Sequence, residues 1–473
     1  MEKDYDIGVI GLAVMGQNLV LNIESNDYKV AVYNRTGSKT KEFIKQRANN
    51  KNIKATYTLK ELVNSLAKPR KILLMVKAGQ PVDLVIDSLL PLLDEDDIII
   101  DGGNSYYKDT NLRHQKLKKA GIRYLGTGVS GGEYGALYGP SIMPGGDESA
   151  YQEVSDILED AAAQTKSGAC VSYLGPNSAG HYVKMVHNGI EYGVMEVISE
   201  IYDIMRKLLA KQPEKISDYF KAWNQEHQSY LIEITYEILK RKDPITNQPL
   251  INVILDKAKQ KGTGKWSAQD ALDLGIAIPT ITAGVKARCL SALKSDREKI
   301  SQEFSRDINF AGDESEFIRN LEDALYIAVI IAYAEGFKLL QAASKEYQYQ
   351  LDFAEIARIW EDGCIIRSSF LKPIQKAYKS NRELLNLIIA PEFKTEISKR
   401  IEGLRKVVSQ VKLQGIAIPA LNSALDYFDS LTSKELPANL IQGQRDYFGA
   451  HTYQRKDKEG TFHTEWQDIH NID

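Results

Sequence analysis

The sequence predicts an α/β domain, then a large all-α domain and last an extended C-terminal tail, and three observations predict this order. In residues 1–178, short runs rich in Val, Ile, Leu and Tyr alternate with helix-length segments, which is typical of a parallel, doubly wound sheet. In residues 179–435, long segments repeat apolar residues at helical spacing. Residues 436–473 are polar and glycine-containing, and their aromatic side chains favour an arm ordered against another surface over a disordered tail.

The expected strands all lie in the first of these domains. They are the runs 6–10, 29–33, 71–76, 97–101, 123–126 and 169–174, and Gly, Asn or Ser follows most of them. After a turn at 174–178 the helical pattern begins, and it predicts helices over 180–209, 215–241, 314–343 and 351–359. Segments 188–205 and 320–340 are faintly alike, too faintly to establish a duplication.

The composition argues against several classes of protein. Lys and Arg total 60 against 63 Asp and Glu, so no cationic excess is present to bind nucleic acid. No apolar stretch reaches the roughly 18–20 residues that span a bilayer, and the first residues do not resemble a secretory signal. Cys170, Cys289 and Cys364 have no paired spacing, which predicts neither disulfides nor a metal site and favours the reducing cytoplasm.

The first candidate site is a glycine-rich turn between the first expected strand and the helix after it. Gly11 permits the sharp turn, Ala13 is small enough for a pyrophosphate to approach, and Gly16 lets the helix pack closely on the strand. About twenty residues further on, Arg35 stands where an acidic residue would favour NAD, so the cofactor expected is NADP. The pattern predicts a Rossmann-type dinucleotide-binding domain, the alternatives being a structural turn and an ordinary surface arginine. The residues concerned are Gly11, Leu12, Ala13, Val14, Met15, Gly16, Asn34, Arg35 and Thr36.

The second candidate site is one face of a predicted helix. Lys184, His187, Asn188 and Glu191 are spaced i, i+3, i+4 and i+7, so they share that face. A solvated ion pair is the ordinary explanation of such a lysine and glutamate, but the surrounding residues are apolar, which favours a cleft. A desolvated lysine can act as a base near neutral pH, and a buried glutamate can stay protonated and act as an acid.

Further candidates could bind anions or polyols. The run from Ser130 through Gly131 to Gly132 could form a backbone nest, although a tight turn is equally consistent with it. Lys261 and Lys265 flank a flexible loop that lacks the order of a P-loop. Arg288, Arg445 and His451 add three cationic or titratable groups, and together with Lys261 they indicate an anionic phosphate ligand.

In this order and over essentially the whole chain, these motifs resemble the 6-phosphogluconate dehydrogenase family, the decarboxylating, NADP-dependent enzymes of the pentose phosphate pathway. The matching segments are 11–16, 34–36, 75–79, 101–105, 130–133, 139–146, 184–193, 260–266, 363–367 and 445–451. The resemblance implies that Lys184 is the general base and Glu191 the general acid, with no metal. It implies that Val76, Lys77, Ala78 and Asn104 contact the cofactor.

The resemblance also implies how 6-phosphogluconate is held. The implied substrate contacts are Asn104, Ser130, Gly131, Gly132, His187, Asn188, Tyr192, Lys261, Arg288, Arg445 and His451. Because the family's tail crosses into the neighbouring subunit, Arg445 and His451 would complete the site of the partner, and the protein would be a homodimer with exchanged tails.

Five residues depart from the family's usual pattern, namely Tyr134, Leu137, Val194, Glu361 and Asp362. None falls on a position assigned to chemistry, so they bear on loop dynamics and turnover. Two other functions stay open. A non-decarboxylating β-hydroxyacid dehydrogenase would not need the phosphate-binding cations, and a catalytically silent NADP-binding scaffold would not need both Lys184 and Glu191.

Overall fold

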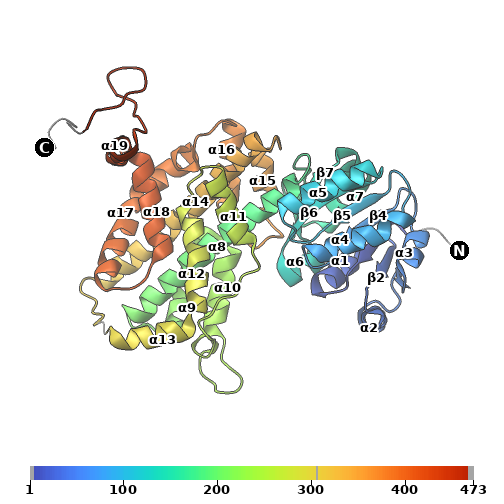
Figure 1. The fold of residues 1–473 in the computed structure, drawn as a ribbon. Helices are drawn as coiled ribbons and strands as arrows, with labels where there is room; N and C mark the ends of the chain where they lie inside the picture. Colours follow the sequence, from blue (N-terminus) through green and yellow to red (C-terminus); the bar gives the residue numbers. More distant parts are fainter. Residues whose placement is uncertain (1–4, 305–306, 467–473) are drawn as a thin grey trace. The chain divides into compact units, whose positions relative to one another are not determined.

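The computed structural model describes residues 5–304 and 307–466. The chain forms two compact units, Met1–Ala424 and Leu425–Asp473, each described here by itself. The first unit contains both the α/β part and most of the helical part (Figure 1). The domain boundaries expected after residues 178 and 435 remain predictions.

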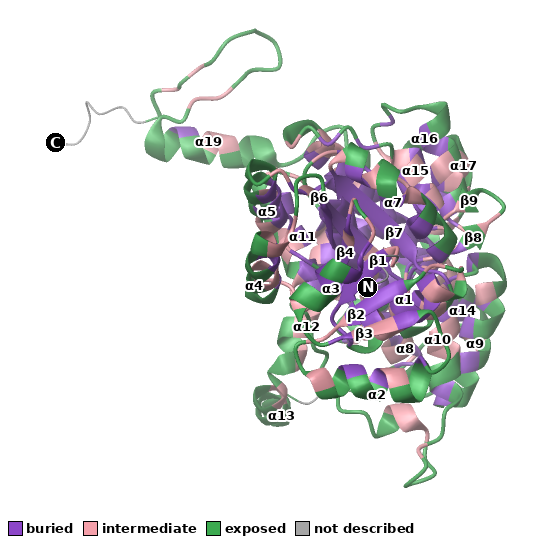
Figure 2. Ribbon diagram, turned by 90° about the vertical axis from the view of Figure 1, so that its right-hand side faces the viewer, coloured by how far each residue is buried: buried purple, intermediate pink, exposed green. Residues whose placement is uncertain are grey.

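The α/β part is a seven-stranded sheet in the order β3-β2-β1-β4-β5-β6-β7. Six strands are parallel, and β7 runs antiparallel to β6. Alternate residues of β5 belong to two hydrophobic clusters, Ile98 and Ile100 to one and Ile99 to the other, so the sheet is buried on both faces (Figure 2). The expected doubly wound Rossmann-type fold is confirmed. The strands are β1 (Ile7–Ile10), β2 (Val30–Tyr33), β3 (Ile53–Thr56), β4 (Lys71–Leu74), β5 (Ile98–Asp101), β6 (Arg123–Ser130) and β7 (Ser141–Gly146).

The helices of this part connect and cover the strands. They are α1 (Val14–Ser25), α2 (Gly37–Arg47), α3 (Leu59–Ser65), α4 (Gln80–Leu89), α5 (Tyr107–Lys119), α6 (Gly132–Tyr138) and α7 (Glu148–Ala161).

Three strand assignments differ from those expected. The strand predicted over 169–174 is wrong. Only β9 (Gly168–Ala169) is a strand there, pairing with β8 (Gln164–Thr165), and an isolated bridge joins Val171 to Ile142. Strand β3 was not expected, because its sequence Ile-Lys-Ala-Thr contains too few apolar residues to form a clear strand pattern. Strand β7 was not expected because it contains Pro144 and two glycines, which an edge strand tolerates and a central strand does not.

The helical part is built around two long helices, α8 (Ala179–Lys207) and α14 (Glu314–Glu346), which pack on each other. The helix predicted over 215–241 is two helices, because Gln228 between them adopts a left-handed conformation with φ +44°. No helix within the described ranges is both long and apolar enough to cross a membrane. The remaining helices are α9 (Pro213–His227), α10 (Tyr230–Lys240), α11 (Thr263–Asp273), α12 (Pro279–Ala292), α13 (Lys294–Glu303), α15 (Phe353–Ile359), α16 (Leu371–Ser380), α17 (Pro391–Leu413) and α18 (Pro419–Thr432).

The second unit has a helix of its own, α19 (Ala438–Gly449), so among the described residues the predicted irregular tail is limited mainly to 450–466. Residues 467–473 of the predicted tail lie outside the described residues. The buried carboxylate of Asp446 on this helix accepts hydrogen bonds from the amide of Thr452 at 2.9 Å and from the Trp466 indole at 2.8 Å. His463 Nδ1 lies 2.9 Å from the same carboxylate. Although burial alone would raise it, these partners lower the pKa of Asp446 to about 2. The carboxylate therefore holds the end of the described chain against α19.

Candidate active site

A cavity of about 520 Å³ lies beyond the carboxyl ends of β1, β2 and β4, where a doubly wound sheet binds nucleotides. Gly11 has φ +106°, and a Cβ on it would lie 2.4 Å from the carbonyl oxygen of Met75. A Cβ on Gly16 would lie 2.0 Å from the carbonyl oxygen of Gly11. Both positions therefore require glycine, because a side chain at either would collide with a backbone carbonyl group.

The residues after β2 form the second side of this cavity. The Oδ1 of Asn34 accepts a hydrogen bond from the Leu12 amide at 3.0 Å, and its Nδ2 donates to the Thr36 carbonyl at 3.1 Å. Arg35 is exposed, and Lys39, which the sequence prediction missed, also lines the cavity. It could have been found as a second cation one turn after Arg35. The predicted residues that line the cavity are Gly11, Ala13, Asn34, Arg35, Thr36, Val76 and Lys77. Those not among its lining are Leu12, Val14, Met15, Gly16, Ala78 and Asn104.

Lys184 lies on α8 where that helix crosses strand β6. A Cβ on Gly128 of β6 would lie 2.4 Å from the Cβ of Lys184, so the glycine makes room for the lysine stem. Lys184 is only 6% exposed. Burial lowers the pKa of Lys184 to about 8, although the nearby Glu191 and Cys364 act to raise it. A lysine with this pKa is partly unprotonated at neutral pH and can accept a proton.

His187 connects Lys184 to the last residue of β6. Its Nδ1 lies 3.4 Å from Lys184 Nζ and 3.1 Å from Asn188 Oδ1, and its Nε2 lies 3.2 Å from Ser130 Oγ. Burial and the charge of Lys184 hold the pKa of His187 well below its ordinary value. The imidazole is therefore neutral and orients its neighbours through hydrogen bonds.

Glu191 is the next polar residue along this face of α8. Burial raises its pKa, while the charges of Lys184, Arg288 and Lys261 act to lower it. A carboxyl group with a raised pKa can be present in its protonated form and donate that proton. The structure thus places a candidate base and a candidate acid on the same helix, with three cations near the acid.

The cations mark one end of the site. The guanidinium of Arg288 on α12 lies 3.4 Å from the ring centre of Tyr192, in a cation–π arrangement. A Cβ on Gly264 would lie 2.7 Å from the Tyr192 ring, so the first turn of α11 passes close to the same ring. Lys261 itself is exposed and precedes α11.

Two turns of the α/β part carry further candidate residues. Gly131 has φ +124°, and a Cβ on it would lie 2.6 Å from the carbonyl oxygen of Gly363, while Gly132 has φ +62°. Asn104 is exposed on a turn after β5 that the buried carboxylate of Asp101 organises. This carboxylate accepts hydrogen bonds from the Gly103 amide at 3.1 Å and from the Ser105 hydroxyl at 2.6 Å.

Arg445 and His451 belong to the second unit. Arg445 is exposed on α19 and donates to Gln442 Oε1 at 3.1 Å. His451 follows that helix, is exposed, and lies edge-on to the Phe448 ring. Their convergence with the other candidate residues therefore stays a prediction.

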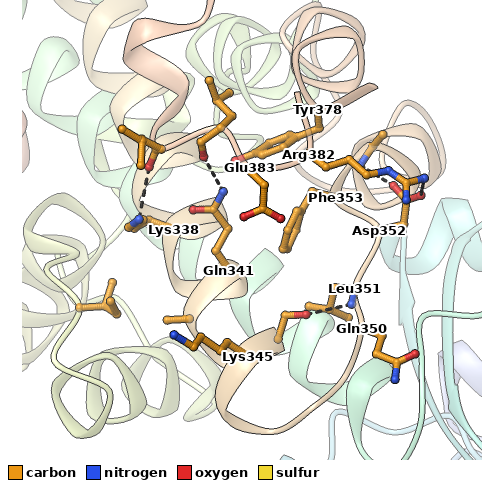
Figure 3. Close-up of a pocket in the computed structure, with 16 residues that line it drawn as sticks. Lys338, Gln341, Lys345, Gln350, Leu351, Asp352, Phe353, Tyr378, Arg382 and Glu383 are labelled. Carbon is orange, nitrogen blue, oxygen red and sulfur yellow. Dashed lines mark hydrogen bonds and ion pairs between the residues drawn. The ribbon is translucent and has the colours of Figure 1, made fainter. Parts of the chain in front are cut away.

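A different cavity, of about 740 Å³, lies beside α14 and α16 (Figure 3). It contains none of the predicted site residues. Lys338 donates to the Leu385 carbonyl at 3.3 Å, and Arg382 lies 3.7 Å from Asp352, so two of its cations already have partners. Among the described residues, no group of three or more His, Cys, Asp or Glu side chains is arranged to hold a metal ion.

Two family models match the chain from residue 6 to residue 466. Residues 6–175 match the NAD binding domain of 6-phosphogluconate dehydrogenase, and residues 180–466 match the C-terminal domain of 6-phosphogluconate dehydrogenase. The chain belongs to the 6-phosphogluconate dehydrogenase family.

Relatives in this family are similar over nearly the full length. The NADP(+)-dependent, decarboxylating 6-phosphogluconate dehydrogenase of Bacillus subtilis is 53% identical over 97% of this chain and 98% of its own. The decarboxylating 6-phosphogluconate dehydrogenase of Synechococcus elongatus is 51% identical over the same shares. The Plasmodium falciparum 6-phosphogluconate dehydrogenase, solved in its apo form and in complex with NADP+ and with 6-phosphogluconate, is 48% identical, with a TM-score of 0.95 over 98% of this chain and 100% of that one.

The positions at which this 6-phosphogluconate dehydrogenase family member departs from the usual pattern lie mostly beside the site. Tyr134, Leu137 and Asp362 line a cavity of about 590 Å³ that Gly131 also lines. Glu361 accepts a hydrogen bond from the Ser167 hydroxyl at 3.2 Å, and Val194 is buried in α8. None of the five contacts Lys184 through a hydrogen bond or ion pair within the described structure.

Proposed function

We propose that this chain catalyses the NADP-dependent oxidative decarboxylation of 6-phosphogluconate to ribulose 5-phosphate, carbon dioxide and NADPH. The observation that carries the proposal is the buried Lys184 with its lowered pKa, on one helix with a carboxyl group whose pKa is raised. The named activity of relatives that share about half of their residues with this chain supports the same reaction.

In the proposed mechanism, neutral Lys184 removes the proton from the C3 hydroxyl of the substrate. When NADP is bound, it accepts the hydride from C3. The product is a β-keto acid, and protonated Lys184 then donates a hydrogen bond to the new carbonyl oxygen. This stabilises the enediolate that forms as carbon dioxide leaves. Glu191 delivers a proton to the carbon that lost the carboxylate, which is C2 of the substrate and C1 of the product, and this gives the ketose.

The remaining candidate residues are proposed to bind either the two ends of the substrate or the cofactor. Ser130, Gly131, Gly132, His187 and Asn188 would hold the carboxylate and hydroxyls, and Tyr192, Lys261 and Arg288 would hold the phosphate. Asn104 would contact both substrate and nicotinamide. The cofactor would contact Gly11, Leu12, Ala13, Val14, Met15, Gly16, Asn34, Arg35, Thr36, Val76, Lys77 and Ala78, with Lys39 added from the structure.

A direct assay tests the reaction. Purified protein with NADP and 6-phosphogluconate should form NADPH and trapped carbon dioxide in equal amounts. NADPH without carbon dioxide would instead favour the non-decarboxylating β-hydroxyacid dehydrogenase. Neither product from correctly folded protein would favour the silent scaffold.

The choice of NADP over NAD is proposed to depend on Arg35. The Arg35→Ala change should raise the KM for NADP about tenfold or more, because a charged contact to the 2′-phosphate is lost, and should hardly change the KM for NAD. Initial rates with both cofactors provide the measurement, and Lys39→Ala should act in the same direction. An equal rise for both cofactors would contradict the role of Arg35.

The pH dependence should follow Lys184. Its pKa is about 8 and the base must be unprotonated. The value of kcat/KM should therefore increase as the pH is raised through about 8, and it should be lower at more acidic pH. Because the charge of Glu191 acts to raise this pKa, the Glu191→Gln change should move the rising limb to lower pH. Profiles of kcat/KM for both proteins provide the test, and a limb near pH 10 would contradict the lowered pKa of Lys184.

The active form is proposed to be a cytoplasmic homodimer in which Arg445 and His451 of one subunit complete the partner's site. The absence of disulfides among the three cysteines is consistent with the cytoplasm. The exposed side chains of Arg445 and His451 are available for such an exchange. Mixing an inactive Lys184→Met protein with an inactive Arg445→Ala protein should restore part of the activity, because a mixed dimer has one intact site. No recovery after verified subunit exchange would contradict the shared site.

A further inference from the structure

Two helices of the helical part begin with the same sequence. Gly-Ile-Ala-Ile-Pro occurs at 275–279 and again at 415–419, and its proline is the first residue of α12 in one copy and of α18 in the other. The residue before the proline is isoleucine in both copies, and an isoleucine side chain cannot accept hydrogen bonds from the first amides of a helix.

A buried glutamate from another helix replaces the missing cap in each copy. Glu335 of α14 accepts hydrogen bonds from the amides of Thr280 and Ile281, both at 2.9 Å. Glu200 of α8 accepts hydrogen bonds from the amide of Ala420 at 2.6 Å and from that of Leu421 at 2.9 Å. Both glutamates are almost fully buried. The start of each helix is thus fixed by a carboxyl group far away in the sequence.

Only one of the two helices extends along the candidate site. A Cβ on Gly284 of α12 would lie 2.5 Å from the carbonyl oxygen of Tyr192, and a Cβ on Gly193 would lie 3.4 Å from the Cα of Ile281. Helix α12 therefore packs directly on the part of α8 that follows Glu191. Two turns after the capped end, α12 carries Arg288, whose guanidinium covers the Tyr192 ring. No predicted site residue lies on α18.

We propose that Glu335 is a positioning residue for the phosphate end of the substrate. By holding the first turn of α12, it fixes the position of α12 along its axis relative to α8. This keeps the Arg288 guanidinium over the Tyr192 ring. Glu200 has the same chemistry in the repeated copy but serves only stability. The inference rests on the proposed function, because the phosphate role of Arg288 comes from there.

Glu335→Gln and Glu200→Gln form a matched pair, because each keeps the side-chain shape and removes one of two amide-accepting oxygens. Both should lower the melting temperature. Glu335→Gln should also raise the KM for 6-phosphogluconate about tenfold, the scale of one lost hydrogen bond, with kcat changed less than about twofold. Glu200→Gln should leave both constants unchanged. Glu335→Asp, which keeps the carboxylate on a shorter stem, should give a smaller KM rise and serves if the glutamine variant does not fold.

A double-mutant cycle separates positioning from general loosening. Arg288→Ala alone should raise the KM, and adding Glu335→Gln to it should raise the KM no further, because the group being positioned is gone. Additive effects, or a KM rise of the same size in Glu200→Gln, would overturn the role of Glu335. If Arg288→Ala alone leaves the KM unchanged, the phosphate role in the proposed function fails. If Arg288→Ala raises the KM and Glu335→Gln does not, the inference alone fails.

Discussion

Replacing Lys184 with methionine is expected to lower kcat by about 10³-fold or more, with little change in substrate affinity. Methionine keeps the apolar stem that packs over Gly128, so the helix and strand should stay in contact. What is lost is the amine that we propose accepts the proton before hydride transfer and donates a hydrogen bond during decarboxylation. Because both steps use the same group, the loss should exceed that of a residue that serves one step.

Single-turnover kinetics with NADP, together with calorimetric titration of 6-phosphogluconate, provide the measurement. Lys207→Met is the matched control, because Lys207 lies at the end of the same helix, is exposed, and pairs with Asp203 at 2.7 Å. The control should keep full kcat. A Lys184→Met protein that retains more than about a tenth of kcat would remove this residue from the proton-transfer step.

The helix that carries the candidate base and acid could be predicted because its signal is local. Lys184, His187, Asn188 and Glu191 lie within two turns, so the helical period alone places them on one face. The turn at Gly11 is equally local, since strand, turn and helix follow one another directly in the sequence. In both cases the relevant neighbours are fewer than ten residues apart, and the sequence pattern is sufficient.

The sequence could not predict contacts between distant segments. From the sequence alone, Gly128 is a residue that weakens a strand, and its contact with α8 is visible only in the structure. Likewise, Pro144 argues against a strand, and only the structure shows that β7 lies at the edge of the sheet, where proline is tolerated. Segments 188–205 and 320–340 contain Glu200 and Glu335, and only the structure shows that these two side chains cap the two copies of one motif. These features depend on long-range packing, which leaves no periodicity in the sequence.

Gly128→Ala is expected to reduce kcat/KM by about 100-fold, although the residue carries no functional group. A Cβ at this position would lie 2.4 Å from Lys184 Cβ and 2.9 Å from its Cγ, both closer than real side-chain contacts. Helix α8 has little freedom to yield, because a Cβ on Gly180 would itself lie 2.2 Å from the Met143 carbonyl oxygen, so helix and sheet already touch there. The lysine stem must therefore shift, and a displacement of about 1 Å is enough to remove most of the benefit of orientation.

Steady-state kinetics and NADP titration of the Gly128→Ala protein would separate this effect from a general loss of structure. Cofactor affinity should stay near the wild-type value, because the cofactor cavity lies at β1, β2 and β4 and not at β6. Gly37→Ala in α2 is the matched control, since the nearest atom to its added Cβ is 3.5 Å away on Tyr57. That change should leave kcat unchanged. If Gly128→Ala also left kcat unchanged, Lys184 would tolerate displacement from β6. The contact between α8 and β6 would then not determine the position of the base.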